Sequence, residues 1–164
     1  MLRHLVNIIL WGLPPTRLFG LRRLLLRFVG LDLAKDVAVC GQGWFFGPGR
    51  VQIGAGTWLS PRVLIYTHVD APIAIGEACD IGPFVRIITG SHEIGPANRR
   101  AGRGTAKPVS IESGCWIGAN TLILGGVKIG HGTIVAAGSV VISDLPANCL
   151  AAGVPAKIKH ALAE

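Results

Sequence analysis

Aliphatic residues recur every six positions over most of this chain, and this period constrains the fold more than any other feature of the sequence. Glycine often follows the aliphatic residue, and a small or β-branched residue usually comes four positions after it. The aliphatic residues fall into three registers: Ile53, Leu59 and Ile65; Ile75, Ile81 and Ile87; and Ile111, Ile117, Ile123, Ile129, Val135 and Val141. The period excludes an amphipathic helix, because six matches neither the helical period of about 3.6 nor the alternation of a single strand.

A period of six fits a short strand followed by a turn, with one aliphatic side chain pointing inward. Three such units would close one triangular coil, and successive coils would stack at about 4.8 Å through parallel backbone pairing. Glycine and small residues would let the chain turn at the corners. The segment 53–144 therefore predicts roughly five stacked coils of a parallel β-helix. The period does not set the hand of the coil, and the general rule for parallel crossovers favours a right-handed path.

Composition narrows the possible partners. The chain carries a formal net charge of +7, so it attracts polyanions, but it contains no nucleic-acid-binding motif and no basic stretch interleaved with aromatic residues. We therefore expect no nucleic acid partner, and a phosphorylated cofactor fits the charge better. The four cysteines form no CxxC pair, which indicates reduced thiols in a cytoplasmic protein and no metal site. Cys79 and Cys115 fall in the small-residue column, where they would fill corners of the coil.

The repeat is interrupted twice, and the interruptions are where we expect chemistry. Ile65 and Ile75 are ten positions apart instead of six, and Ile87 and Ile111 are 24 apart. The longer interruption predicts a loop over residues 90–108 that projects from the coil, and loops on rigid scaffolds commonly carry function. His92 opens this loop. An imidazole titrates near neutral pH, so His92 suits a general base, although a loop histidine that only bonds to the backbone fits the position as well.

Several motifs resemble those of one family. The segment Thr89-Gly90-Ser91-His92-Glu93 closely resembles the Thr-Gly-Ser-His segment of the maltose, galactoside and colanic-acid type sugar O-acetyltransferases, which are hexapeptide-repeat transferases. Later segments are similar to the motifs that follow it in that family: Pro108–Ile111, Cys115–Ala119, Gly125–Gly130, Ala136–Val141 and Ala152–Lys157. The resemblance covers about residues 50–160. It implies a left-handed parallel β-helix, a homotrimer and acetyl-CoA as co-substrate.

The resemblance also implies roles for particular residues. His92 matches the general base, and the backbone N–H of Ala119 matches the group that faces the thioester oxygen and stabilises the oxyanion. Ala137 matches a contact to the pantetheine arm, and Lys157, with Lys159 nearby, matches a basic residue that meets the phosphates. The Thr-Lys pair that the family has after its Ala-Gly-Ser-Val-Val run is replaced here by Ile142-Ser143, so one usual phosphate contact is missing.

The acceptor side departs further from the family. Arg62 aligns with an Asn that contacts acceptor and cofactor in the maltose and galactoside branch, which predicts a different acceptor pocket here. Asp70 aligns with an acceptor-binding Asp, although it also suits a plain turn residue. The sequence leaves the partner that orients His92 open. The candidates are Glu93, Glu77, Asp80, Glu112 and a backbone carbonyl.

Residues 1–36 lack the repeat and predict an N-terminal helical segment. Residues 17–28 have helical apolar spacing and four arginines, with Pro14-Pro15 before them and Gly30 after them. This segment either caps the first coil or lies on an anionic membrane surface through residues 1–30, at the inner face. The apolar run over residues 5–13 is too short to span a bilayer. We expect the β-helix over residues 37–149 and a short helical tail over 150–164.

The leading hypothesis is a cytoplasmic O-acetyltransferase that moves acetyl from acetyl-CoA directly to a sugar or glycan hydroxyl, as in polysaccharide biosynthesis. N-acetylation of an amino sugar or another small amine is the nearest alternative, since it would also use His92. A carbonic anhydrase of the same fold would need three His ligands to zinc, and His68, His92 and His131 lack the closely spaced pair typical of that family. The remaining alternative is a structural β-helix subunit without catalytic activity.

Overall fold

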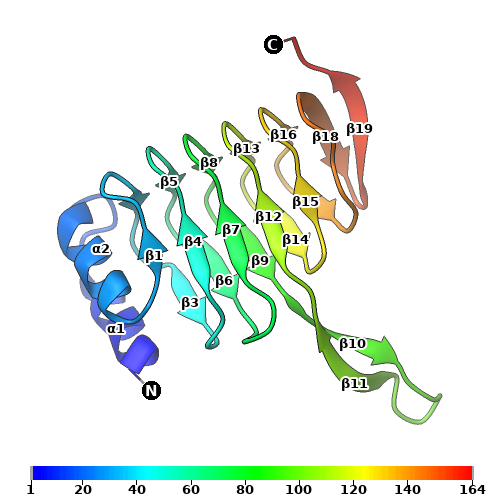
Figure 1. Ribbon diagram of the computed structural model, residues 1–164, viewed down its shortest axis with the longest axis horizontal. Coiled ribbons are helices and arrows are strands. Elements are labelled where there is room, and N and C mark those ends of the chain that lie inside the picture. Colours follow the sequence, from blue (N-terminus) through cyan, green and yellow to red (C-terminus); the bar gives the residue numbers. More distant parts are fainter. Residues whose placement is uncertain (1, 164) are drawn as a thin grey trace.

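The computed structural model describes residues 2–163, and its body is a parallel β-helix with three faces (Figure 1). The first sheet contains β1 (Asp32–Leu33), β4 (Val51–Ile53), β7 (Ile73–Ile75), β12 (Val109–Ile111) and β15 (Lys128–Ile129). The second contains β2 (Ala38–Val39), β5 (Trp58–Leu59), β8 (Asp80–Ile81), β13 (Trp116–Ile117), β16 (Ile134–Val135), β18 (Cys149–Gly153) and β19 (Ala156–Ala161). The third contains β3 (Trp44–Phe46), β6 (Leu64–Tyr66), β9 (Arg86–Ile88), β14 (Leu122–Leu124) and β17 (Val140–Val141).

The chain visits the three sheets in turn, so each coil has three corners. Two of them matter for function. We call the turns from the second to the third sheet the alanine corner (residues 40–43, 60–63, 82–85, 118–121 and 136–139). The turns from the third to the first sheet form the hairpin corner (residues 47–50, 67–72, 89–108, 125–127 and 142–144). The coil winds left-handed as it advances from the N-terminal to the C-terminal end, as the family resemblance implies (Figure 1).

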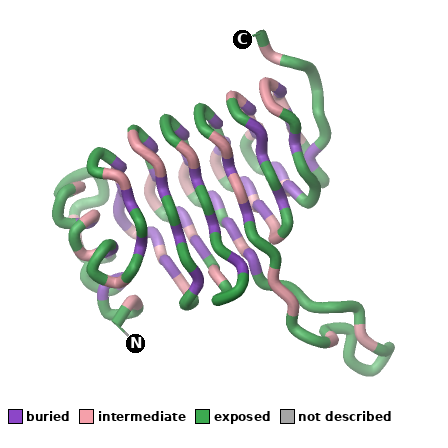
Figure 2. Tube along the Cα trace, in the orientation of Figure 1, coloured by how far each residue is buried: buried purple, intermediate pink, exposed green. Residues whose placement is uncertain are grey.

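The predicted aliphatic registers form the interior. The residues of the three registers are at most 2% exposed. Buried segments recur along the strands of every coil (Figure 2). Parallel pairing sets them in columns, as in Ile53 beside Ile75 and Ile75 beside Ile111. Burying one isoleucine contributes roughly 2–3 kcal/mol. The small residues fill corners as predicted, because Cys79 is buried and its thiol donates to the carbonyl of Glu112 at 3.1 Å.

The repeat begins earlier than we predicted. β1 starts at Asp32, ahead of the expected boundary at residue 37, and pairs with β4. Leu33, Val39 and Phe45 point inward six positions apart and continue the interior columns. Two helices, α1 (Leu2–Gly12) and α2 (Phe19–Phe28), cover this end of the coil, which agrees with the predicted helical segment (Figure 1).

The predicted C-terminal helix is wrong. Residues 149–161 form an antiparallel hairpin in which β18 pairs with β16 as the last rung of the second sheet, and β19 folds back onto β18. The turn at Gly153, whose φ is +110°, reverses the chain, and a left-handed φ of this kind favours glycine. A strand is favoured here because the last coil presents unpaired backbone groups, which a further strand satisfies and a helix does not.

Candidate active site

The two interruptions of the repeat lie at the same corner in neighbouring coils. β6 pairs with β9, so the turn 67–72 that follows β6 lies against the start of the long insertion that follows β9. The insertion is an antiparallel hairpin of β10 (Gly90–Ile94) and β11 (Ala101–Ala106), and it projects from the body as predicted (Figure 1). Fully buried Thr89 joins the two segments, because its hydroxyl accepts from the N–H of His68 at 3.0 Å and donates to the carbonyl of Tyr66 at 3.3 Å.

A shallow cavity of about 300 Å³ opens at the base of this hairpin. It is lined by His68, Gly90, Ser91, His92, Gly104 and Thr105. From the sequence, His68 was a candidate only as a zinc ligand, and its place in one cavity with His92 was not predicted. The signal was its position, because His68 stands at the start of the shorter interruption and that interruption stacks on the longer one.

His92 is exposed on β10 opposite Gly104, and its ring is held by the backbone. Its Nδ1 lies 3.0 Å from the carbonyl oxygen of Gly102. A carbonyl only accepts, so Nδ1 donates the proton in this bond and Nε2 of the neutral ring keeps its lone pair. The sequence left several candidates open for the partner that orients His92. In the structure this partner is a backbone carbonyl, that of Gly102. The arrangement gives a base of fixed tautomer facing solvent.

Asp70 lies on the turn that carries His68. Its backbone N–H donates to Nδ1 of His68 at 3.3 Å, and its carboxylate oxygen Oδ2 lies 3.5 Å from the same nitrogen. A neutral His68 that accepts this bond carries its proton on Nε2. Asp70 therefore serves the turn and is exposed beside the cavity without lining it.

Ala119 and Ala137 lie one above the other at the alanine corner. The N–H of Gly138 donates to the carbonyl of Ala119 at 2.8 Å, and a Cβ on Gly118 would come within 2.5 Å of the backbone nitrogen of Ala137. Within residues 2–163, the N–H of Ala119 donates to no acceptor. The predicted oxyanion donor is thus free to bind a ligand.

The C-terminal hairpin extends the same edge. The N–H of Gly153 donates to the hydroxyl of Ser139 at 3.2 Å, and Lys157 pairs with Ala152 in the hairpin. Lys157 and Lys159 are both exposed on β19. The resemblance assigns four residues to the cofactor: Ala119, Ala137, Lys157 and Lys159. They therefore lie along one edge of the molecule, which runs from the coil of β12, β13 and β14 to the C-terminal hairpin.

A second shallow cavity, of about 360 Å³, lies on the second sheet next to this corner. Trp58 and Trp116 are 37% and 57% exposed and form its walls, while Gly82 and Pro83 place its rim at the alanine corner. Aromatic walls of this kind provide apolar contact area for a ligand.

Arg62 also belongs to the alanine corner. Its Nε donates to the side-chain oxygen of Gln42 at 2.9 Å, and its guanidinium lies 5.3 Å from the centre of the Phe84 ring. The structure therefore groups Arg62 with Ala119 and separates it from His92 within one chain. His131 lies at the remaining corner with Glu112 and Asn148. Among residues 2–163, no group of three His, Cys, Asp or Glu side chains is placed to hold a metal ion.

Comparisons with known proteins find similar chains among hexapeptide-repeat acetyltransferases. The family model "Bacterial transferase hexapeptide (six repeats)" matches residues 108–143. The galactoside O-acetyltransferase of Lactococcus lactis is 35% identical over 115 residues, which are 70% of this chain and 55% of that one, so the chain spans about half the length of that relative. The Escherichia coli protein named "Putative colanic acid biosynthesis acetyltransferase WcaF" is 30% identical over 153 residues, 93% of this chain and 81% of that one.

Among solved structures, the hexapeptide-repeat-containing acetyltransferase VCA0836 of Vibrio cholerae in complex with acetyl coenzyme A superposes with a TM-score of 0.77. It is 28% identical and the match covers 99% of this chain and 86% of that one. The likeness thus includes both helices at the N-terminal end and the C-terminal hairpin.

Proposed function

The chain belongs to the hexapeptide-repeat acetyltransferase family, and from this membership we propose that it transfers the acetyl group of acetyl-CoA to a hydroxyl of a sugar or glycan, with His92 as general base. The sugar class is supported by two relatives, one named galactoside O-acetyltransferase and the other named putative colanic acid biosynthesis acetyltransferase. The observation that carries the base assignment is the hydrogen bond between His92 Nδ1 and Gly102, because it leaves Nε2 unprotonated in the cavity.

The proposed step is a direct transfer in a ternary complex. Nε2 of His92 takes the proton of the acceptor hydroxyl while the oxygen attacks the thioester carbonyl. The carbonyl oxygen gains negative charge, which the free N–H of Ala119 stabilises. The C–S bond then breaks, the acetyl group stays on the acceptor oxygen, and the proton on His92 passes to the sulfur of coenzyme A.

This step needs more than one copy of the chain. His92 stands at the hairpin corner and Ala119 at the alanine corner, which are opposite edges of the third sheet. We propose a homotrimer in which His92 of one copy faces the alanine corner of the next. The projecting hairpin supports this, because β10, which carries His92, pairs only with β11 and leaves the three sheets of its own coil (Figure 1).

The alanine corner supports the proposed coenzyme A site. Trp116 offers an apolar wall beside Ala119, and Lys157 and Lys159 place positive charge at the far end of the same edge. The adenosine and phosphate end of the cofactor would lie against the lysines, and the thioester would lie near Ala119. The resemblance implies a further phosphate contact at positions 142 and 143, but Ile142 and Ser143 carry no charge, so the two lysines carry more of the phosphate contact than the family pattern implies.

The test is release of coenzyme A from acetyl-CoA by the wild type and by His92→Ala, against a panel of sugars, amino sugars and lipid-linked glycans. We expect release that depends on a hydroxyl acceptor and falls roughly 10²–10⁴-fold in His92→Ala. His131→Ala is the matched control, since His131 is exposed at another corner. Near-normal turnover in His92→Ala refutes the base. Transfer only to free amines supports N-acetylation instead, and no turnover with any acceptor supports a structural subunit.

A further inference from the structure

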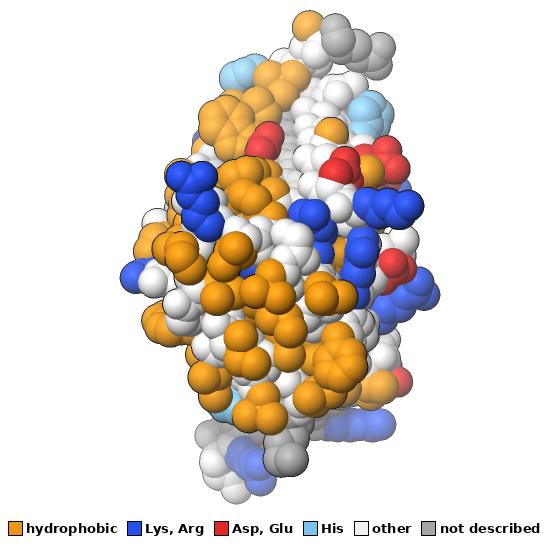
Figure 3. Space-filling model, turned by 90° about the vertical axis from the view of Figure 1, so that its left-hand side faces the viewer, with side chains coloured by type: hydrophobic (Ala, Val, Ile, Leu, Met, Phe, Trp, Pro, Cys, Tyr) orange, Lys and Arg blue, Asp and Glu red, His pale blue; other side chains and the backbone are white. Residues whose placement is uncertain are grey.

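The two N-terminal helices expose a broad apolar surface at one end of the molecule. Large apolar side chains gather over this end, with basic side chains around them (Figure 3). We call this surface the end face, and it consists of exposed side chains of α1, α2 and the turn between them: Leu2, Leu5, Ile8, Ile9, Trp11, Leu18, Leu21, Leu24 and Phe28. Their exposed fractions range from 41% to 71%. Apolar patches of this kind mark interaction surfaces.

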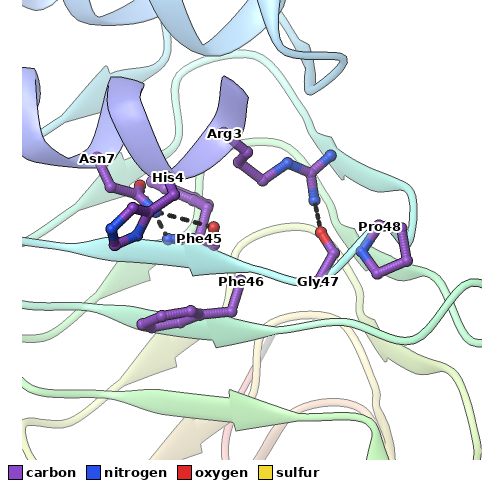
Figure 4. Close-up of a pocket in the computed structure, with 7 residues that line it drawn as sticks. All are labelled: Arg3, His4, Asn7, Phe45, Phe46, Gly47 and Pro48. Atoms are coloured by element: carbon purple, nitrogen blue, oxygen red, sulfur yellow. Dashed lines mark hydrogen bonds between the residues drawn. The ribbon is translucent and has the colours of Figure 1, made fainter. Parts of the chain in front are cut away.

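The helices are firmly seated, so these side chains do not belong to the core. On α1, the side chain of Asn7 is buried, donates to the carbonyl of Phe45 at 3.0 Å and accepts from its N–H at 3.2 Å. Arg3 donates to the carbonyl of Gly47 across a cavity of about 400 Å³ between helix and coil (Figure 4). Val6, Asn7 and Leu10 are the buried residues of α1 and face the first coil, so its exposed apolar side chains lie on the other side of the helix.

The two helices and the turn between them carry charge of one sign. Residues 2–31 contain five arginines and no Asp or Glu. Buried Arg22 donates to the carbonyls of Leu10, Leu13 and Pro14 and fixes the turn between the helices. Arg23 and Arg27 also donate to backbone carbonyls. None of these bonds supplies a negative charge, so the end face keeps the positive charge of its arginines.

We propose that the end face docks on an anionic lipid surface, with α1 and α2 lying in the interface. Neither helix is long and apolar enough to cross a membrane, whereas an apolar face bordered by arginines suits the headgroup region. A second copy fits less well, because a face-to-face pair would bring together the arginines of both copies, of which Arg17 and Arg27 are exposed, without a carboxylate from these segments. Each exposed arginine near an anionic surface strengthens the attraction.

This orientation has a consequence for the acceptor, which rests on the proposed function. The helices cover the end of the coil, so the axis of the β-helix would be roughly perpendicular to the membrane surface (Figure 1). The hairpin follows β9, which belongs to the third coil from the N-terminal end. This coil lies two spacings of about 4.8 Å from the first coil. Adding a helix layer of about 10 Å places the cavity of His92 about 20 Å above the lipid. The acceptor favoured by this geometry is a glycan carried on a lipid anchor.

The test is cosedimentation of the full chain with vesicles of phosphatidylcholine alone and with about one third phosphatidylglycerol, at low and high salt. We expect binding to the anionic vesicles only, weakened by salt, and reduced at least tenfold in Leu24→Glu and Phe28→Glu. Arg17→Gln, which removes an exposed charge, should weaken binding about fivefold. Ile142→Glu is the matched control, since Ile142 is 55% exposed on the last coil, at the opposite end.

Vesicle binding is measured without substrate, so its failure is distinct from failure of the acetyl transfer. If the wild type does not bind anionic vesicles, or if Phe28→Glu binds as well as Ile142→Glu, the proposal is overturned. A different outcome is that light scattering shows the molar mass of the assembly doubling as the protein concentration rises, and that Leu24→Glu abolishes this doubling. In that case the end face binds a second copy, and the lipid assignment is wrong. Circular dichroism checks that the variants remain folded.

Discussion

Replacing Gly102 by Ala should weaken the support of His92 without touching the imidazole. A Cβ at this position would lie 2.9 Å from the carbonyl oxygen of Glu93 and 3.1 Å from the nitrogen of Gly95, both of which are backbone atoms. Ordinary contacts begin near 3.5 Å, so β10 and β11 must separate by roughly 0.5 Å. That movement would stretch the bond from Nδ1 of His92 to Gly102 from 3.0 Å to about 3.5 Å, beyond the normal range.

The expected result is a fall of about 10- to 100-fold in kcat, less than in His92→Ala, because the base remains but is misplaced. A tenfold fall corresponds to about 1.4 kcal/mol on the barrier. KM for acetyl-CoA should stay unchanged, since the proposed cofactor edge lies at the other corner. Nitrogen NMR of the ring should show a protonated Nδ1 in the wild type and a tautomer mixture in the variant.

The control is Gly12→Ala, because a Cβ on Gly12 meets nothing within 4 Å. If Gly102→Ala keeps kcat within twofold, or if its loss appears in KM for acetyl-CoA alone, the carbonyl does not position the base and the reasoning is refuted.

Three further predictions concern the scaffold. Thr89→Val should lower the free energy of unfolding by about 1–3 kcal/mol in urea titration, since it leaves the N–H of His68 unpaired, while Thr89→Ser should stay near wild type. Ile117→Ala should cost about 2–5 kcal/mol in the same assay, because Ile117 is fully buried between neighbouring coils. The ammonium of Lys128, 2.7 Å from Glu112, lowers the pKa of that carboxyl. Stability from this pair is therefore present above about pH 5 and lost as the pH falls through the lowered pKa, so Glu112→Gln should flatten the acid limb of an unfolding-against-pH curve.

The interior could be predicted from the sequence because each coil repeats the same local requirement. An inward aliphatic such as Ile81 needs only its neighbours in the coils above and below, so a fixed spacing is enough to place it. The start of the first coil at residue 32 was missed, although residues 37–49 lay within the predicted β-helix, because Phe45 stands where later coils have an aliphatic residue and Val39 is not followed by glycine. The spacing of Leu33, Val39 and Phe45 was still six, and the period alone would have placed the boundary at residue 32.

The ends of the coil were harder to predict, since their structure depends on backbone groups that the sequence pattern does not reveal. Residues 156–161 have no strong strand signal, yet they pair with β18 because that strand would otherwise be an open edge. The outward side of α1 is as apolar as its inward side, so the sequence could not say which residues remain exposed. The bonds of Asn7 to Phe45 decide that orientation.

The position of His92 shows how an interrupted repeat builds a site from segments far apart in sequence. Because coils stack in register, an insertion after β6 and another after β9 must emerge at the same corner, one directly above the other. Their lengths differ, so the shorter forms a turn that supports the base of the longer, and Thr89 bonds both. Because this register is fixed, Ala119 and His92 of one chain lie at different corners. A catalytic step that uses both therefore depends on assembly, and activity should be lost in any variant that remains folded but monomeric, as gel filtration and coenzyme A release together would test.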